Sequence, residues 1–547
     1  MMIGVLYPQR CNSESDSQIV GESAGPLVLA AVRRSVSQPQ AQPLSLAGLN
    51  QTRMLVAVDI PDCWGDILGD WLASNKTRKL VVLGRMPASL YRRFGWGGRA
   101  LPDLSEVGSS VPAPAKATAR SRAEIVYGER AERLGASGWR RPFERFDFAD
   151  EWNNLGFGAV RCVGDKWSIA HGLETYDDEV AAIHIDGLPT GSFVALHDAP
   201  GYSVLWINRP VGFIDSYEWR MLEHFWASYR AATLPCQPVI REIPFGYDAC
   251  ITSRLDCDED VESARPLWEA YKSLNVPFSL AVHTTNLRDS AHHPILRELV
   301  ACDEALLSHT ATHAPNWGGT YERAFEEGRR SMEDIFAVTG QRVRYAVSPF
   351  HQSPDYALDA LSDVGYEGCI GGLIRNDPAF LIARGGPLNN LPHSFIGHSQ
   401  QCMMHGDCLL EEGDALATFK CAFDQAYQTA TLFGYLDHPF SPRYSYGWST
   451  EHARIDAHTE LIAYIRQVAA KPLFLNENQA MDFLRLKSSL SIFQIDNCGD
   501  AGAEMRFTAL EGGMLPAVTL RDGIALGIAV EFCGRVFAAA SLAEQRQ

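Results

Sequence analysis

Short apolar runs alternate with amphipathic segments along most of the chain, and this pattern predicts an α/β protein. Two β-branched runs, MLVAVDI (54–60) and KLVVLGR (79–85), flank a helical segment, CWGDILGDWLASN. This strand–helix–strand order is typical of parallel sheets. Further strands are expected at SFVALHD and YSVLWINRPVG, and a helix at DSYEWRMLEHFWASYRAA. We therefore predict an N-terminal α/β domain over residues 1–240.

The same alternation returns from residue 246 to about residue 487. The expected strands are ACITSRLD, VPFSLAVHT, EALLSHT, VRYAVSP, YEGCIGG and TLFGYLDHP. The expected helices are ESARPLWEAYKSL, HPILRELVA, TYERAFEEGRRSMEDIFAVTG, PDYALDALSDV and TFKCAFDQAYQTA. This predicts a second α/β domain over 246–487. In α/β barrels the carboxyl ends of the strands carry the active site, so we expect a site among the polar residues there.

The remaining segments are shorter. Residues 488–547 contain the runs LSIFQID, AEMRFTAL, AVTLRD, IALGIAVEF and RVFAAASL with turn signals between them, which predicts a small C-terminal β domain. Residues 36–52 and 105–122 are rich in Ser, Pro, Ala and Gln, and we expect both to be loops or linkers.

Composition narrows the classes of function. The 547 residues include 48 Lys and Arg against 66 Asp and Glu, a formal charge of −18. With no basic run, nucleic acid and anionic membrane surfaces are disfavoured as partners. The early apolar run GPLVLAAV is far shorter than the roughly 20 residues of a membrane span. The N-terminus lacks the pattern of a secretory signal, so we expect a cytoplasmic protein. Thirteen cysteines, scattered and without a C-x-x-C pair, indicate reduced and mostly buried thiols.

Four polar clusters each follow an expected strand of 246–487. Alone, each has an ordinary interpretation: a D-x-D pattern before a helix often serves as a cap, as Asp260 and Glu262 could here, and H-x-x-x-H is usually a pair of polar residues. Their shared position at strand ends favours a common site. The clusters are Asp256-Cys257-Asp258, His309 with His313 in HTATH, Pro349-Phe350-His351, and His438.

These residue types suit hydrolysis at a metal. A hydrolytic metal needs a few protein ligands and an open position, and Asp258, His309 and His313 would supply them. The metal lowers the pKa of bound water and polarises a substrate carbonyl. Asp256 could then take the proton of that water as a general base, and His438 could protonate the leaving group.

Residues 246–487 resemble the polysaccharide deacetylases, the NodB-homology group of carbohydrate esterases. The resemblance rests on the segments RLDCDED, HTATH, VSPFH, LFGYLDHP and FLNENQAMDFLRL. It implies a distorted (β/α) barrel of about seven strands that removes N- or O-linked acetyl groups from sugars. It also implies a role for each matched residue: Asp256 as the catalytic base, Asp258, His309 and His313 as ligands of a divalent metal, expected to be Zn²⁺, and His438 as the general acid.

The chain departs from the family pattern at its third motif, where Val347 stands in place of an arginine that normally pairs with the base. Arg254 is the leading replacement, because a strand places residues 254 and 256 on one face. Arg344 and Arg375 are the alternatives. The fourth motif, usually an Asp and a Trp, is not recognisable, and Asp377 lies in the nearest polar cluster.

Other residues are candidates for binding substrate. We expect Pro349, Phe350 and His351 to line the site, and Trp317 to stack on a sugar ring. The segment PHSFIGHSQQCMMHGDC (392–408) could be a second zinc site, a substrate-binding loop or a solvent loop. In the N-terminal domain, which could be amidotransferase-like or flavodoxin-like, Cys63 could be a nucleophile or a buried thiol.

The leading functional hypothesis is a metal-dependent hydrolase that removes an acetyl group from a sugar or a cytoplasmic saccharide precursor. One alternative is an allantoinase-like amide hydrolase acting on a small nitrogen heterocycle. Another is a non-catalytic carbohydrate-binding or assembly protein with a degenerate deacetylase domain, which the missing motif arginine favours. A role in binding substrate or a partner is expected for the N-terminal domain, and a homo-oligomer is left open.

Overall fold

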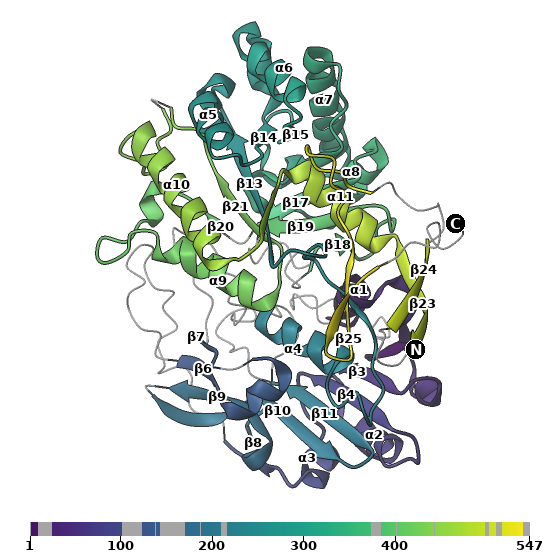
Figure 1. The fold of residues 1–547 in the computed structure, drawn as a ribbon. Helices are drawn as coiled ribbons and strands as arrows, with labels where there is room; N and C mark the ends of the chain where they lie inside the picture. Colours follow the sequence, from purple (N-terminus) through teal and green to yellow (C-terminus); the bar gives the residue numbers. More distant parts are fainter. Residues whose placement is uncertain are drawn as a thin grey trace.

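The computed structural model describes most of the chain. The described residues are 2–8, 24–100, 123–136, 138–142, 170–185, 187–208, 216–372, 384–400, 402–441, 443–497, 503–509 and 517–539. They form a mixed α/β structure with two large sheets (Figure 1). The predicted α/β class is therefore confirmed. No described helix is long and apolar enough to cross a membrane.

The first sheet has nine strands and occupies the lower part of Figure 1. Its order is β2 (Ala41–Leu44), β1 (Ile3–Leu6), β3 (Met54–Val58), β4 (Arg78–Leu83), β11 (Tyr202–Ile207), β10 (Leu188–Ala199), β9 (Glu179–Ile185), β6 (Ala123–Tyr127) and β7 (Arg140–Pro142). The pairs from β2 to β11 are parallel and the others antiparallel. The helices in this region are α1 (Ala24–Val36), α2 (Gly65–Leu72), α3 (Ala88–Arg93) and α4 (Ser216–Ala227), and a separate ladder joins β5 (Gly97–Gly98) to β8 (Leu173–Glu174).

Residues 36–52 are not the loop that their composition predicts. They include strand β2, which pairs in parallel with β1, and two short 3-10 turns. Pro43 lies in β2 at the edge of the sheet, where a missing N–H costs no ladder hydrogen bond. The other expected loop, 105–122, lies outside the described residues.

The second sheet has ten strands. Nine lie in the order β18 (Gly386–Pro387), β19 (Ile396–Gln400), β17 (Gly368–Gly372), β16 (Tyr345–Val347), β15 (Ala305–Ser308), β14 (Ser279–Val282), β13 (Ala249–Cys257), β21 (Phe433–Asp437) and β20 (Cys402–Met403), and β22 (Pro472–Leu475) pairs with the first half of β13. The helices are α5 (Arg265–Ser273), α6 (His293–Ala301), α7 (Tyr321–Thr339), α8 (Asp355–Val364), α9 (Ala417–Thr429), α10 (Glu451–Val468) and α11 (Glu477–Ser488).

The second sheet is almost wholly parallel, with only β18 and β19 running in opposite directions. Its strands therefore share one carboxyl edge. Apolar side chains of its middle strands pack with Met481 and Leu484 of α11 in one buried cluster. The ladders describe an open path from β18 to β20, so closure into a seven-stranded barrel stays a prediction.

The C-terminal part is rich in strands. β23 (Leu490–Asn497) and β24 (Ala503–Ala509) form an antiparallel hairpin. β25 (Ala529–Phe532) pairs with β26 (Arg535–Ala538) and also with β12 (Val239–Ile240), a strand located between the two large sheets in the sequence. One hydrophobic cluster contains residues of both large sheets, including Val56 and Phe433. The division into domains at 240 and 488 stays a prediction.

Candidate active site

Strand β13 supplies an ion pair beside its carboxyl end. The strand is buried along its full length, and its alternation turns Arg254 and Asp256 to one face. The Arg254 guanidinium donates two hydrogen bonds to the Asp256 carboxylate, and the distance from Nη2 to Oδ2 is 2.9 Å. Burial alone would raise the pKa of Asp256, but the charges of Arg254 and His309 outweigh it and lower the pKa to about 2. Asp256 is therefore ionised at neutral pH.

Three ligand atoms converge next to this pair. Asp258 Oδ1 lies 3.4 Å from His309 Nε2 and 3.3 Å from His313 Nε2. The two Nε2 atoms are 3.1 Å apart. In a tetrahedral zinc site with bonds of about 2.0–2.1 Å, neighbouring ligand atoms are about 3.3 Å apart. The buried Asp258 Oδ1 accepts no hydrogen bond in the described structure. This triangle fits three ligands of one divalent metal.

The pKa values of the two imidazoles shift in opposite directions. His309 Nδ1 lies 3.2 Å from the carbonyl oxygen of Val347, so it must donate, and in the neutral ring Nε2 then carries a free lone pair. Burial alone would lower the pKa of His309, but the charges of Asp256 and Asp258 outweigh it and raise the pKa. Burial, reinforced by the neighbouring His309, lowers the pKa of His313 to about 4. His313 is therefore a neutral imidazole at neutral pH, the form that binds metals.

The loop after β15 holds both histidines in place. His313 N donates to Thr310 Oγ1 at 2.8 Å, and Thr310 and His313 both adopt positive φ angles, 66° and 52°. Glu327 of α7 accepts hydrogen bonds from the backbone N–H groups of Ala311 and Thr312, at 2.9 and 2.8 Å. Glu327 thus anchors the strained loop, a role that nothing in the sequence indicated.

His438, the first residue after β21, lies near the second carboxylate oxygen of Asp258. Its Nε2 lies 3.8 Å from Asp258 Oδ2, and its Nδ1 lies 3.0 Å from His405 Nε2. Its ring stacks on Tyr446, with centroids 4.0 Å apart and planes inclined by 15°. The Tyr446 hydroxyl donates to Asp258 Oδ2 at 3.0 Å. Tyr446 is a second residue of the site that the sequence did not reveal.

A second group of possible ligands is less suited to a metal. His405, Asp437 and His438 also bring ligand atoms together. The buried Asp437 carboxylate, however, accepts hydrogen bonds from His458 Nε2 at 2.9 Å and Trp448 Nε1 at 3.3 Å, and Arg454 compensates its charge from 3.7 Å. Because the Asp437 carboxylate already has hydrogen-bond donors and a counter-charge, Asp258, His309 and His313 are the better candidates for a metal site.

The predicted substrate-binding residues differ in their exposure to solvent. The Phe350 ring is partly exposed and lies 4.5 Å from the ring of His313, while Pro349 and His351 are buried beside it. Burial, aided by the charge of Arg254, lowers the pKa of His351 to about 3. Trp317 is 0% exposed and donates through Nε1 to the Gln352 carbonyl, so the prediction that it stacks on a sugar is wrong.

The arginines that could replace the missing motif arginine have different partners. Arg254 alone is paired with Asp256 in the described structure. Arg344 pairs with Glu367 and Asp482. Arg375 and Asp377 lie outside the described residues. The Arg254–Asp256 pair is the contact that the missing arginine at Val347 was expected to make.

The segment 392–408 is not a solvent loop. It includes the buried strands β19 and β20, and the thiols of Cys402 and Cys408 are also buried. His393 Nε2 contacts the Ser488 carbonyl at 2.9 Å, whereas His405 contacts His438. Among the described residues, these histidines and cysteines do not gather into a common metal site.

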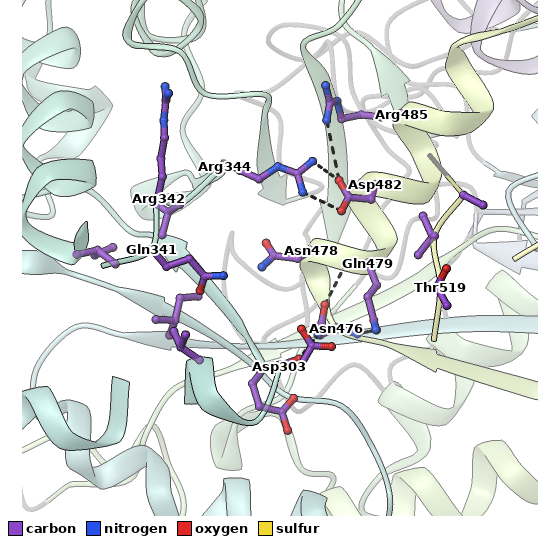
Figure 2. Close-up of a pocket in the computed structure, with 17 residues that line it drawn as sticks. Asp303, Gln341, Arg342, Arg344, Asn476, Asn478, Gln479, Asp482, Arg485 and Thr519 are labelled. Carbon is purple, nitrogen blue, oxygen red and sulfur yellow. Dashed lines mark hydrogen bonds and ion pairs between the residues drawn. The ribbon is translucent and has the colours of Figure 1, made fainter. Parts of the chain in front are cut away.

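A cavity of about 370 Å³ lies at the opposite edge of the second sheet (Figure 2). It is lined at the amino ends of β15 and β16 and at the start of α11. Figure 2 shows Arg344 and Arg485 directed at Asp482, and both arginines also pair with Glu367. Apart from Arg344, none of the residues predicted for the site lines this cavity.

Comparison with known proteins gives matches only among solved structures. No family model and no curated protein matches this sequence. A Mycobacterium smegmatis protein described as a candidate polysaccharide deacetylase is 14% identical, with a TM-score of 0.36, over 44% of this chain and 92% of its own. An allantoinase is 13% identical, with a TM-score of 0.35, over 44% of this chain and 92% of its own.

A pseudoenzyme of carbohydrate esterase family 4 from Bacillus anthracis is 14% identical, with a TM-score of 0.28, over 45% of this chain and 69% of its own. Each match covers less than half of this chain. Over a segment, the chain is similar to solved structures that include a candidate polysaccharide deacetylase, an allantoinase and a pseudoenzyme.

Proposed function

We propose that this protein is a metal-dependent hydrolase that removes an N- or O-linked acetyl group from a sugar or a saccharide precursor. The observation that carries the proposal is the triangle of Asp258 Oδ1, His309 Nε2 and His313 Nε2, with edges of 3.1–3.4 Å, beside the ionised Asp256. Two imidazoles and one carboxylate are a usual ligand set for hydrolytic zinc, so Zn²⁺ is the ion that we expect. At such a site the metal supplies Lewis acidity toward the carbonyl and acidifies water.

The residues of the chain divide the proton transfers between them. Asp256 accepts the proton of the attacking water, and Arg254 keeps this carboxylate charged and oriented through its two hydrogen bonds. His438 donates a proton to the departing nitrogen or oxygen of the sugar. Its Nδ1 contact with His405 and its stacking on Tyr446 fix the direction of Nε2, which faces Asp258. Phe350, beside His313, lines the entrance for the acetyl group.

The test combines metal analysis with an assay of acetate release from N- and O-acetylated sugars. Asp258→Ala and His309→Ala should lose both metal and activity. Asp256→Asn should keep the metal and lose activity. His452→Gln, which alters an exposed histidine on α10, is the matched control and should change neither. Wild-type acetate release by Asp256→Asn would show that Asp256 is not the base.

The two alternatives remain as outcomes of the same assay. A cyclic-amide hydrolase would open a small nitrogen heterocycle and release no acetate from any sugar. A non-catalytic protein would bind sugar and turn over neither class of substrate. The Arg254–Asp256 pair favours an enzyme, because the absence of an arginine partner for the base was the reason to expect a degenerate site. Cytoplasmic location, a homo-oligomer and a binding role for the N-terminal domain stay predictions.

A further inference from the structure

A buried lysine in the first sheet contacts, among the described residues, one group that can carry a negative charge, a thiol. Lys79 of β4 is 1% exposed. Its Nζ donates to the Phe225 carbonyl at 2.6 Å and to Cys236 Sγ at 3.4 Å. No carboxylate lies within ion-pair distance of it in the described part of the chain. A buried ammonium without an anion is costly, and a thiolate at Cys236 would compensate its charge.

A second cysteine reaches the same place from the C-terminal part. Cys533 lies in the turn between β25 and β26, and its backbone N–H donates to the Ala227 carbonyl at 2.8 Å. Gln237, the residue after Cys236, donates its backbone N–H to the adjacent Trp226 carbonyl at 3.0 Å. Cys236 and Cys533 therefore both lie against the end of α4, and their thiols interact.

The two thiols differ in ways that suit a reactive pair. Cys236 is 6% exposed and lies against the Lys79 ammonium, whereas Cys533 is exposed. Burial and the neighbouring Cys236 raise the pKa of Cys533 to about 11, so Cys533 keeps its proton at neutral pH. A cysteine beside a lysine ammonium is the kind that reacts as the thiolate nucleophile.

We propose that Cys236 and Cys533 form an oxidation site, which a hydroperoxide converts into a reversible disulfide. The Cys236 thiolate attacks one peroxide oxygen, the O–O bond breaks, and a sulfenic acid forms while water or an alcohol leaves. The Cys533 sulfur then attacks the Cys236 sulfur, the S–O bond breaks, and the hydroxide departs with the Cys533 proton as water. Two thiols are oxidised and one peroxide is reduced.

The disulfide would join two distant parts of the sequence. The β25–β26 ribbon would become covalently attached to the segment between α4 and β12. Closing so long a loop constrains the unfolded chain, so the oxidised protein should unfold at a higher temperature than the reduced protein. The inference is independent of the proposed hydrolase activity, because none of these three residues belongs to the candidate site.

The test is peptide mapping of the full-length protein after one equivalent of hydrogen peroxide. We expect a linked peptide containing Cys236 and Cys533, the loss of two hydrogen atoms in the intact mass, and reversal by dithiothreitol. Cys533→Ser should give a sulfenic acid at Cys236 that dimedone traps. Cys421→Ser, which removes an exposed thiol of α9, is the matched control and should form the same link as the wild type. Thiols at 236 and 533 that stay reduced, or that pair elsewhere, would overturn the proposal.

The role of Lys79 has its own readout. Lys79→Met should slow oxidation of Cys236 about tenfold or more, because the thiolate loses its counter-charge. Lys79→Arg keeps the charge and should react within about threefold of the wild-type rate. If Lys79→Met does not fold, Lys79→Arg and Cys533→Ser still decide whether the pair forms. Equal rates for Lys79→Met and the wild type would remove Lys79 from the site.

Discussion

Both edges of the second sheet carry clusters of charged and polar side chains. Those at the amino edge are paired with one another, whereas those at the carboxyl edge bring possible metal ligands together. At the amino edge, the cavity of about 370 Å³ is lined by charges that neutralise one another, with Arg344 between Glu367 and Asp482 (Figure 2). At the carboxyl edge, a crevice of about 10 Å³ adjoins Asp258. There Asp258 Oδ1 accepts no hydrogen bond from the described residues, and two imidazole nitrogens face each other. The converging ligand atoms favour the carboxyl edge as the place of the proposed chemistry, although the cavity of about 370 Å³ lies at the amino edge.

The backbone makes the same distinction. Several non-glycine residues around the carboxyl-edge site have φ angles in the left-handed region, which costs free energy and persists where the surroundings enforce it. They are Thr310, His313, Phe350, His351 and Tyr446. At the amino edge, Asn476 and Gln479 instead form a regular capping box at the start of α11. Strained residues are more numerous around the ligands, and among the residues that line the cavity Asp303 alone has such an angle, with a φ of 57°.

The largest expected effect separates the two edges directly. Asp258→Ala should abolish metal binding and reduce acetate release by about a thousandfold or more, because one of three ligands is lost. Gln341→Ala, in the amino-edge cavity, should leave metal content and rate unchanged. Metal analysis and steady-state kinetics check both. A Gln341→Ala enzyme with the defect of Asp258→Ala would place the chemistry at the wrong edge.

Removing an arginine should also cost more at the carboxyl edge. Arg254→Met leaves the Asp256 carboxylate buried and unpaired, which should lower the free energy of unfolding by about 3–5 kcal/mol. Arg344→Met breaks pairs whose side chains are 30–37% exposed, and it should cost about 1 kcal/mol. Urea unfolding measures both values. Equal losses would contradict the difference in burial between the two pairs.

Acid should weaken the Asp256 pair in a defined pH range. The pKa of Asp256 is about 2 in the folded protein and about 3.9 in an unfolded chain, so the pair stabilises the fold above about pH 4. The stabilisation should disappear as the pH falls from about 4 to about 2, and it amounts to about 2–3 kcal/mol. The measurement is the difference in unfolding free energy between the wild type and Asp256→Asn across this range. Parallel curves for the two proteins would mean that Asp256 is not held ionised.

The smallest effect concerns the hydroxyl that Asp258 receives from the loop after β21. Tyr446→Phe removes the donor to Asp258 Oδ2 while keeping the ring against His438, and it should weaken metal binding about 10- to 100-fold. Tyr444→Phe is the matched control, since Tyr444 is 46% exposed and stacks on Tyr446, and it should keep wild-type affinity. Competition with a fluorescent zinc chelator gives both affinities. Identical losses in the two variants would assign the effect to the loop as a whole.

Sequence periodicity explains which parts of the site were predictable. Arg254, Asp256 and Asp258 follow the two-residue repeat of a strand, and His309 and His438 each follow an apolar run, so their place at the carboxyl edge could be inferred before the structure was known. Arg254 could be chosen over Arg344 for the same reason.

Residues that reach the site from other element types had no such signal. Glu327 lies in the second turn of α7, and Tyr446 lies in a loop, where no repeat fixes the direction of a side chain. Trp317 was misplaced because its closeness to His313 in the sequence says nothing about burial. The sequence does not predict strands β19 and β20, because polar residues such as His398 and Gln400 are buried there.

The most direct test is an anomalous diffraction map at the zinc absorption edge, from crystals of the full-length protein grown with Zn²⁺. We predict one strong peak at about 2.0–2.2 Å from Asp258 Oδ1, His309 Nε2 and His313 Nε2. Strong peaks elsewhere, with none among these three atoms, would contradict the proposed metal centre.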